Sequence, residues 1–456
     1  MERKSPATIW CVLANAQNIE DRRLPTMKNG MTEKLNAVAG ALIVGVDIGK
    51  DFHWAQFTDC HGIQVAKAMK FSNDRTGFES IVTRIQSLCN NAVLAHPYRQ
   101  VVVGMEPTGH YWKTLARYLL GGEYELVCVN PYHTKKAKEL DDNSQTTSDP
   151  KDALTIARLI RDGRYFEPYL SEGMYADLRV LETTRTSVKR EENRVKNITT
   201  ALLDEYFPEI YRVFKKPFQG KASRQILRDC PFPSQILEEG EAGVLTIMRK
   251  AVKRGVGVKR ARLLLETAKV SVGVNQGLRA ARLKLNILLD DLERYEAHLE
   301  QIEEQMAEAL NDTGYADQLL SIKGVGVVTA ASFLGEVGNP MRFQDARQIV
   351  RLAGLSLVED SSGKSKGRTH ISKRGRPHLR SLLYTMAMTM VSQNPQMKRL
   401  YNYLKYRQAN PLKGKQALIV IAQKIITMIF SMLKHGTQYC PEKVLGTTRL
   451  KMLEAA

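Results

Sequence analysis

Apolar residues in the first part of the chain come in short runs, and two of these runs end in a carboxylate. Leu42–Val46 is followed at once by Asp47, and Val101–Met105 is followed by Glu106. A short apolar run that stops abruptly is typical of a strand buried in a sheet. The pattern therefore predicts two core strands that each deliver an acidic side chain to the edge of a sheet.

Further elements complete one domain around these two strands. Phe52–Thr58 and Ile63–Lys70 flank a cluster of turn residues, which predicts three antiparallel strands at the start of the domain. The other expected elements are a helix with an apolar face from Phe78 to Leu88, a helix over Tyr111–Leu120, a strand over Glu125–Val129 and a helix from Asp149. This order is that of a ribonuclease-H-like domain, a mixed sheet with flanking helices and an α/β architecture.

The middle of the chain shows helical periodicity. Met174–Tyr206 and Val258–Val270 are expected helices, whereas the proline-rich start of residues 207–257 predicts a loop or insertion. From Leu285 to Met306 apolar residues recur at alternating spacings of three and four, which is the seam of a coiled coil. This seam fits pairing with the Met174–Tyr206 helix of the same chain and pairing with a second subunit equally well.

The last part of the chain is expected to be mainly helical. Ile322–Gly326 lies between two helical patterns and resembles a helix-hairpin-helix, in which glycines let backbone N–H groups approach a phosphate. A tight turn between two core helices fits the same residues. Leu379–Val391 and Gln416–Leu433 have broad apolar faces and are expected to be core helices.

The charge of the chain is positive and unevenly distributed. The formal charge is +19, and +16 of it comes from residues 339–456. No acidic residue occurs between Ser361 and Lys434. Such asymmetry indicates a polyanionic partner, of which nucleic acid is the usual one.

Cysteine usage and hydropathy bear on the compartment. The six cysteines are scattered without a CxxC pair, so they indicate neither a zinc site nor a disulfide framework. This usage is typical of a reducing, intracellular protein, and we expect a cytoplasmic location. No apolar run approaches the ~18 residues of a membrane-spanning helix, so no membrane partner is expected.

Two more acidic residues join the two at the strand ends. Asp149 and Asp152 are three residues apart at the start of an expected helix, so they share one face. Each of them alone fits helix capping and the helix dipole. Together with Asp47 and Glu106 they form a set of hard oxygen ligands, which suits Mg²⁺ or Mn²⁺ in phosphodiester cleavage.

A polar, glycine-rich and basic segment follows Gly354. It contains Ser361 and Ser362, and a serine among cations is a candidate nucleophile at a phosphate. The cations that we expect along a phosphate backbone are Lys364, Lys366, Arg368, Lys373, Arg374, Arg376 and Arg380.

Five segments in one order resemble a known family, the DEDD-type insertion-sequence transposases related to the Piv invertases, which are bridge-RNA-guided serine recombinases. The segments are VGVDIGK at 44–50, GMEPTGHYW at 104–112, SDPKDALTIARLI at 148–160, IKGVGVVTA at 322–330 and LAGLSLVEDSSGKSKGRTHISKRGRPHLRSLL at 352–383. The resemblance implies a RuvC-like domain with Asp47, Glu106, Asp149 and Asp152 as a metal-binding tetrad.

The resemblance also implies a second catalytic element. The serine before Gly363, Ser362, would attack a DNA phosphate and become linked to the 5′ end, with Ser361 as the adjacent alternative. The acidic site and the serine loop of different protomers would meet in a homodimer or homotetramer. A structured noncoding bridge RNA would pair with the target and with the DNA of the element ends.

The expected division of the chain is a loose extension over 1–38, a RuvC-like domain over 39–168, a helical and coiled-coil region over 169–315 and a C-terminal transposase domain over 316–456. Two other functions fit parts of the pattern. A junction-resolvase type of nuclease would use only the tetrad and metal-activated water. A nucleic-acid-binding protein with a decayed nuclease fold would need no metal at all.

Overall fold

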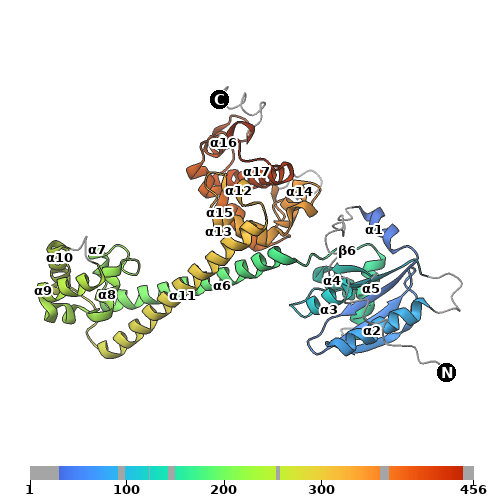
Figure 1. Cartoon of the computed structure of the whole chain (residues 1–456), viewed down its shortest axis with the longest axis horizontal. Helices are drawn as coiled ribbons and strands as arrows, with labels where there is room; N and C mark the ends of the chain where they lie inside the picture. The colour runs from blue at the N-terminus through green and yellow to red at the C-terminus, as the bar shows by residue number, and fades with distance from the viewer. Residues whose placement is uncertain are drawn as a thin grey trace. The chain divides into compact units, whose positions relative to one another are not determined.

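The computed structural model describes residues 30–90, 98–122, 124–141, 149–252, 257–359 and 369–444. Two compact units make up the chain (Figure 1). One unit contains the chain as far as Ser171 together with Met341–Gln344. The other contains Glu172–Pro340 and the chain from Asp345 onward.

The N-terminal unit combines strands and helices. Its elements are α1 (Met31–Val38), β1 (Ala41–Asp47), β2 (Phe52–Thr58), β3 (Gln64–Ser72), α2 (Arg75–Cys89), β4 (Gln100–Met105), α3 (Trp112–Leu120), β5 (Tyr124–Val129), α4 (Pro131–Asp141), α5 (Asp149–Arg161) and β6 (Tyr165–Phe166). The strands form one mixed sheet in the order β3-β2-β1-β4-β5-β6. β1 pairs antiparallel with β2 and parallel with β4. The predicted mixed α/β architecture is therefore confirmed.

Both faces of this sheet are buried, and β1 shows how. Leu42, Val44 and Val46 pack into one core with residues of α2 and α3. Ala41 and Ile43 pack into a second core with residues of α5. Because successive side chains of a strand point to opposite faces, each strand of the sheet centre contributes to both cores.

The N-terminal unit departs from the sequence prediction at two places. The prediction of a loose extension over 1–38 is wrong for residues 31–38, which form helix α1 and bury Val38 in the second core. Residues 1–29 lie outside the described part of the chain. Helix α4 is the second difference. The sequence indicates only that Pro131 ends the preceding strand, whereas in the structure Pro131 is the first residue of α4. Proline favours the first turn of a helix, where no N–H donor is needed.

The second unit is almost entirely helical. Its elements are α6 (Gly173–Tyr206), α7 (Ile210–Val213), α8 (Lys221–Asp229), α9 (Pro233–Ala251), α10 (Val258–Lys269), α11 (Leu278–Asp312), α12 (Ala316–Leu320), α13 (Val327–Val337), α14 (Ala346–Leu352), β7 (Leu357–Glu359), β8 (Thr369–Ile371), α15 (Pro377–Gln393), α16 (Pro395–Tyr406) and α17 (Gly414–His435). A short 3₁₀ turn, η4 (Pro340–Arg342), follows α13.

Two long helices organise this unit. α6 and α11 pack against each other along their length, with α7–α10 at one end and the remaining helices at the other (Figure 1). The predicted seam of α11 faces this contact, and its buried members include Leu285, Leu288, Leu292, Leu299 and Met306. Of the two pairings that the sequence left open for this seam, the structure shows the one with α6 of the same chain.

The segment 207–257, for whose proline-rich start a loop or insertion was predicted, is not a loop but is mainly helical. This segment forms α7, α8 and α9, and its side chains build a core of their own with the adjoining ends of α6 and α11. Phe207, Ile210, Phe232 and Ile236 are fully buried there. Pro233 occupies the first turn of α9, where proline is favoured, and Pro208, Pro217 and Pro231 lie in short connections between helices.

The C-terminal helices surround α13, of which Ala330–Val337 is buried. The glycine turn between α12 and α13 has the expected place, with Gly326 at the N-cap of α13 and Gly324 at φ +96°. Helix α17 has the length and composition of a membrane-spanning helix, yet 61% of its most apolar stretch is buried inside the protein. Burial of that kind is what a core helix requires.

The glycine at position 45 should be essential for the packing of the N-terminal unit. A Cβ atom there would lie 2.2 Å from the carbonyl oxygen of Ala153 and 2.5 Å from the amide of Ala157, both in the backbone of α5. We expect Gly45→Ala to lower the free energy of unfolding by about 3 kcal/mol, as overpacking against rigid backbone does. Urea unfolding followed by circular dichroism measures this change.

Gly121→Ala is the matched control, because its Cβ atom would meet only the Tyr118 carbonyl oxygen at 3.4 Å and its backbone is helical. Equal stability of the two variants would show that the packing of α5 against β1 does not require a glycine at position 45.

Candidate active site

Helix α5 lies unusually close to the two central parallel strands. The close approach is possible because Gly45 of β1 and Gly104 of β4 are neighbours in register. A Cβ atom at Gly104 would lie 2.3 Å from the side chain of Ile160, and one at Gly45 would meet the helix backbone. The first turn of α5 is therefore directed to the sheet end at which β1 and β4 stop.

Two of the predicted acidic residues lie at that sheet end. Val46 pairs with Met105 in the parallel ladder, so Asp47 and Glu106 follow side by side. The alternation of side chains along each strand places both on the face that α5 covers, because Gly45 and Gly104 precede them by two residues. Both carboxylates are partly buried.

The other two predicted acidic residues come from the first turn of α5. Asp149 is exposed, and the side chain of Asp152 retains 18% of its exposure. Asp152 accepts an ion-pair contact of 2.6 Å from the Nζ atom of Lys138 on α4. Four acidic residues from three elements thus converge on one end of the sheet.

The charges of these residues act on one another. The pKa of Asp47 is raised to about 6, first by burial and then by the nearby carboxylates of Asp152, Asp149 and Glu106, whereas Lys138 acts in the opposite direction. Nearby negative charges disfavour ionisation of a carboxyl group in this way. A group of carboxylates that repel each other in a partly buried site is stabilised by a cation.

The chemistry of this donor set fits a divalent ion such as Mg²⁺, which prefers carboxylate and water oxygens. Within the described ranges, no three His, Cys, Asp or Glu side chains lie in an arrangement that could hold a metal ion. The Lys138 ammonium group instead contacts one of the carboxylates. The donors therefore match a metal ion by type and by charge.

Three further residues, Thr108, His53 and Lys138, support this site, and sequence patterns did not single them out. Thr108 donates from its hydroxyl to the Glu106 carboxylate at 3.1 Å. His53, buried on β2, accepts from the amide of Gly49 at 3.2 Å and so fixes the turn after Asp47. The Pro-Thr-Gly turn after Glu106 was a usable signal for Thr108, whereas Lys138 had none because its helix was not predicted.

The predicted nucleophiles Ser361 and Ser362 lie outside the described residues, as do Lys364, Lys366 and Arg368. The ends of their segment are held together, because Glu359 of β7 pairs with Thr369 of β8. β7 and β8 therefore pair antiparallel on either side of this segment.

The described cations of the predicted phosphate surface fall into two groups. Lys373 and Arg374 are exposed. Arg376 donates to the carbonyl oxygen of Glu336, and Arg380 donates to those of Ala353 and Lys373 at 3.1 and 3.2 Å. Since the last two guanidinium groups brace the backbone, their contact with DNA stays a prediction.

The raised pKa of Asp47 has a consequence for stability in the absence of metal. The carboxyl group is protonated in both the folded and unfolded states at low pH. Its cost to stability grows as the pH rises from the ordinary pKa of 3.8 toward about 6 and is fully present above that value. In EDTA we expect Asp47→Asn to melt about 2–4 °C above the wild type at pH 8, with a smaller difference at pH 5. Scanning fluorimetry at the two pH values measures this.

Asp51→Asn removes the same charge from an exposed position four residues away and should leave both melting temperatures unchanged. A lower melting temperature of Asp47→Asn at pH 8 would contradict the electrostatic description of the site.

Comparison with protein families identifies both ends of the chain. A DEDD transposase model of the IS110 type matches residues 44–208. A model described as the transposase IS116/IS110/IS902 family matches residues 316–402. The two models together cover more than half of the chain, and the first spans all four acidic residues.

The chain is similar to two curated insertion-element proteins and to a pilin gene-inverting protein over most of their length. The uncharacterized 44.8 kDa protein of insertion element IS116 from Streptomyces clavuligerus is 26% identical over 87% of this chain and 96% of that protein. The uncharacterized 43.6 kDa protein of insertion element IS110 from Streptomyces coelicolor is 24% identical over 65% of this chain and 72% of that protein. The pilin gene-inverting protein of Moraxella bovis is 22% identical over 87% of this chain and 97% of that protein.

These matches agree with the site that the fold assembles, since the acidic residues lie in the segment that the DEDD model covers. The chain belongs to the IS110/IS116 family of DEDD transposases and is a DNA-binding enzyme of DNA transposition and recombination.

Proposed function

We propose that this transposase cuts and rejoins DNA with two chemical elements, a metal-binding DEDD site and a serine nucleophile. The observation that carries the proposal is the convergence of Asp47, Glu106, Asp149 and Asp152 at one end of the sheet, where burial and the other three carboxylates raise the pKa of Asp47. A purely structural role does not account for four carboxylates in mutual repulsion, because each would be more stable apart.

The family implies a divalent metal ion, and the four carboxylates are the residues that would hold it. We propose Mg²⁺, with Mn²⁺ as the other ion that suits such ligands. A bound divalent ion would stabilise the charge that develops on a phosphate during cleavage. Around it, Thr108 and His53 hold Glu106 and the turn after Asp47 in position.

The proposed nucleophile is Ser362, with Ser361 as the adjacent alternative. Its Oγ would form a bond to phosphorus while the bond from phosphorus to the 3′ oxygen breaks. The serine proton is released and the 3′ oxygen takes up a proton, which leaves a 3′ hydroxyl and a serine linked to the 5′ phosphate. Attack by a 3′ hydroxyl on this linkage reverses the step and rejoins DNA without an external energy source.

The remaining parts of the proposal follow the family resemblance. The N-terminal unit would have the RuvC-like form of the ribonuclease-H-like fold. A noncoding bridge RNA would guide the protein to element ends and target DNA, and two or four protomers would combine the acidic site of one with the serine segment of another. The similarity to the pilin gene-inverting protein supports a recombinase rather than a simple nuclease.

A junction-resolvase type of nuclease remains the second candidate. It is favoured by one observation, which is that the N-terminal unit contains the complete set of four carboxylates. Such an enzyme would cleave with metal-activated water and would not need the serine segment.

Covalent trapping distinguishes these two functions. Purified protein, RNA from its element and duplex DNA carrying the element ends are mixed with Mg²⁺, denatured and separated on a gel. We expect a protein–DNA adduct that disappears in Ser362→Ala and falls at least about 100-fold in Asp47→Ala, since loss of a group that acts in the transition state has effects of this size.

The control variants are Ser361→Ala and Ser365→Ala, which remove neighbouring hydroxyls of the same segment. An adduct lost only in Ser361→Ala would keep the mechanism and change the nucleophile. Cleavage without an adduct in every variant would establish the resolvase-type reaction instead.

A further inference from the structure

The segment from Ile210 to Arg228, between the two long helices, is unusually basic. It contains six Lys and Arg residues and no acidic residue. The six are Arg212, Lys215, Lys216, Lys221, Arg224 and Arg228. A run of this kind can serve structure, binding or solubility, and the contacts of each side chain separate these roles.

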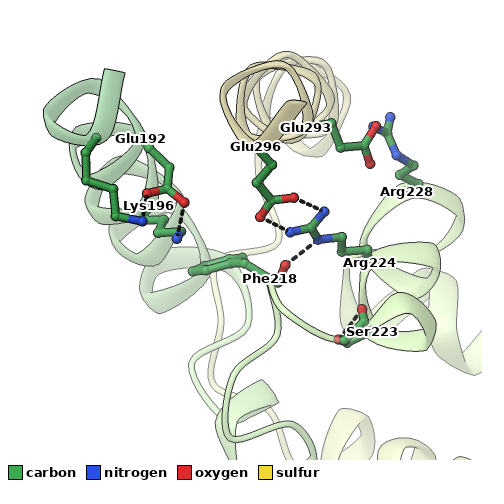
Figure 2. Close-up of polar contacts among 10 residues, drawn as sticks. Glu192, Lys196, Phe218, Ser223, Arg224, Arg228, Glu293 and Glu296 are labelled. Carbon is green, nitrogen blue, oxygen red and sulfur yellow. Dashed lines mark hydrogen bonds and ion pairs between the residues drawn. The ribbon is translucent and has the colours of Figure 1, made fainter. Parts of the chain in front are cut away.

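Two of the six cations are structural. The guanidinium group of Arg224 forms a two-pronged contact with Glu296 of α11, and its Nη1 donates at 2.7 Å (Figure 2). Arg228 reaches Asp290 and Glu293 of the same helix at 2.8 Å each. Planar two-pronged pairs of this kind fix geometry as well as charge. They attach α8 firmly to α11.

The same arginine also fixes the loop before α8. The Nε atom of Arg224 donates to the carbonyl oxygen of Phe218, which lies between α6 and α8 (Figure 2). Phe214 is buried in the core of this region, and Phe218 packs against that core. The loop between α7 and α8 is thus pinned by its aromatic side chains and by one arginine.

The remaining cations of the segment have a different environment. The carboxylate of Glu209 attracts Arg212. Lys215, Lys216 and Lys221 are exposed, and no carboxylate in the described ranges pairs with any of them. The pinned loop and the first residue of α8 therefore present three ammonium groups to solvent, although α11 carries the carboxylates of Asp290, Glu293 and Glu296 on its face toward α8.

We propose that Lys215, Lys216 and Lys221 form a contact site for the phosphate backbone of duplex DNA. The family activity requires this protein to hold DNA, and phosphates are the group that exposed lysines bind as point charges. The aromatic side chains of the loop face the protein core, so the loop offers no platform on which unpaired bases could stack. This favours a duplex over single-stranded nucleic acid.

The site is distinct from the proposed catalytic elements, because it belongs to neither the acidic residues nor the serine segment. It strengthens DNA binding without adding sequence specificity, since contacts with the phosphate backbone position a protein but do not distinguish bases. The helices α7–α10 and their pinned loop then act as a DNA-holding extension at the end of the α6–α11 pair.

The test is the salt dependence of duplex binding by the full chain with Lys215→Gln, Lys216→Gln and Lys221→Gln combined. Fluorescence anisotropy with a labelled duplex of generic sequence gives the dissociation constant between about 50 and 200 mM KCl. We expect the slope of log affinity against log salt to become shallower by about 3 units, one for each lost phosphate contact. The affinity at the lowest salt should fall at least about tenfold.

A matched control removes three positive charges that already have carboxylate partners. Lys250, Arg262 and Arg294 pair with Asp229, Glu241 and Asp291 and are each more than half exposed. The triple Gln variant at these positions should change the slope by less than about 1 unit. Equal losses in the two triple variants would overturn the proposal, because net charge alone would then explain them.

Two further outcomes also overturn it. Unchanged duplex binding by the lysine variant would show that the loop is a solvated surface. Unchanged duplex binding with weakened binding of a folded RNA would assign the lysines to RNA. Thermal melting that matches the wild type confirms that the variant is folded, which the exposure of all three side chains leads us to expect.

Discussion

The close contact between helix α5 and the two central strands is the constraint on which the candidate active site depends. Gly45 and Gly104 remove the side chains that would otherwise hold the helix away from the sheet. The helix backbone can then lie against β1 and β4, and its first turn reaches the strand ends. A few tenths of an ångström matter here, because backbone atoms cannot move aside as a flexible side chain can.

This packing has an electrostatic cost at the candidate active site. It gathers Asp152, Asp149 and Glu106 near the partly buried Asp47, where lost hydration and repulsion raise the pKa of Asp47. Lys138 offsets part of that cost through its contact with Asp152. A bound cation would therefore stabilise the N-terminal unit. Perturbed pKa values of this kind are common at functional sites.

The second unit depends on contacts at both ends of the α6–α11 pair. At one end Arg179 of α6 pairs at 2.8 Å with the buried Glu336 of α13. At the other end Arg224 of α8 pairs with Glu296 of α11. Apolar seams can slide by one turn, whereas buried or two-pronged ion pairs have one geometry. We infer that these pairs fix the register in which the terminal helices sit on the long ones.

The sequence by itself determined what depends on local order. The strand ends at Asp47 and Glu106, the acidic helix start and the seam of α11 all follow from the spacing of apolar residues, because that spacing reflects the repeat of a single strand or helix. The same local information was insufficient for the segment 207–257, where four prolines predict a loop although three of them lie in short connections and Pro233 begins α9.

Only the tertiary structure decided how distant segments meet. It paired the seam with α6 of the same chain, brought Lys138 to Asp152, and turned Arg376 and Arg380 toward backbone carbonyls. It also separated the structural Arg224 from lysines of the same basic run. These outcomes depend on the partner that each side chain finds in space. Sequence periodicity specifies which face of an element is apolar, but it does not specify which other element covers that face.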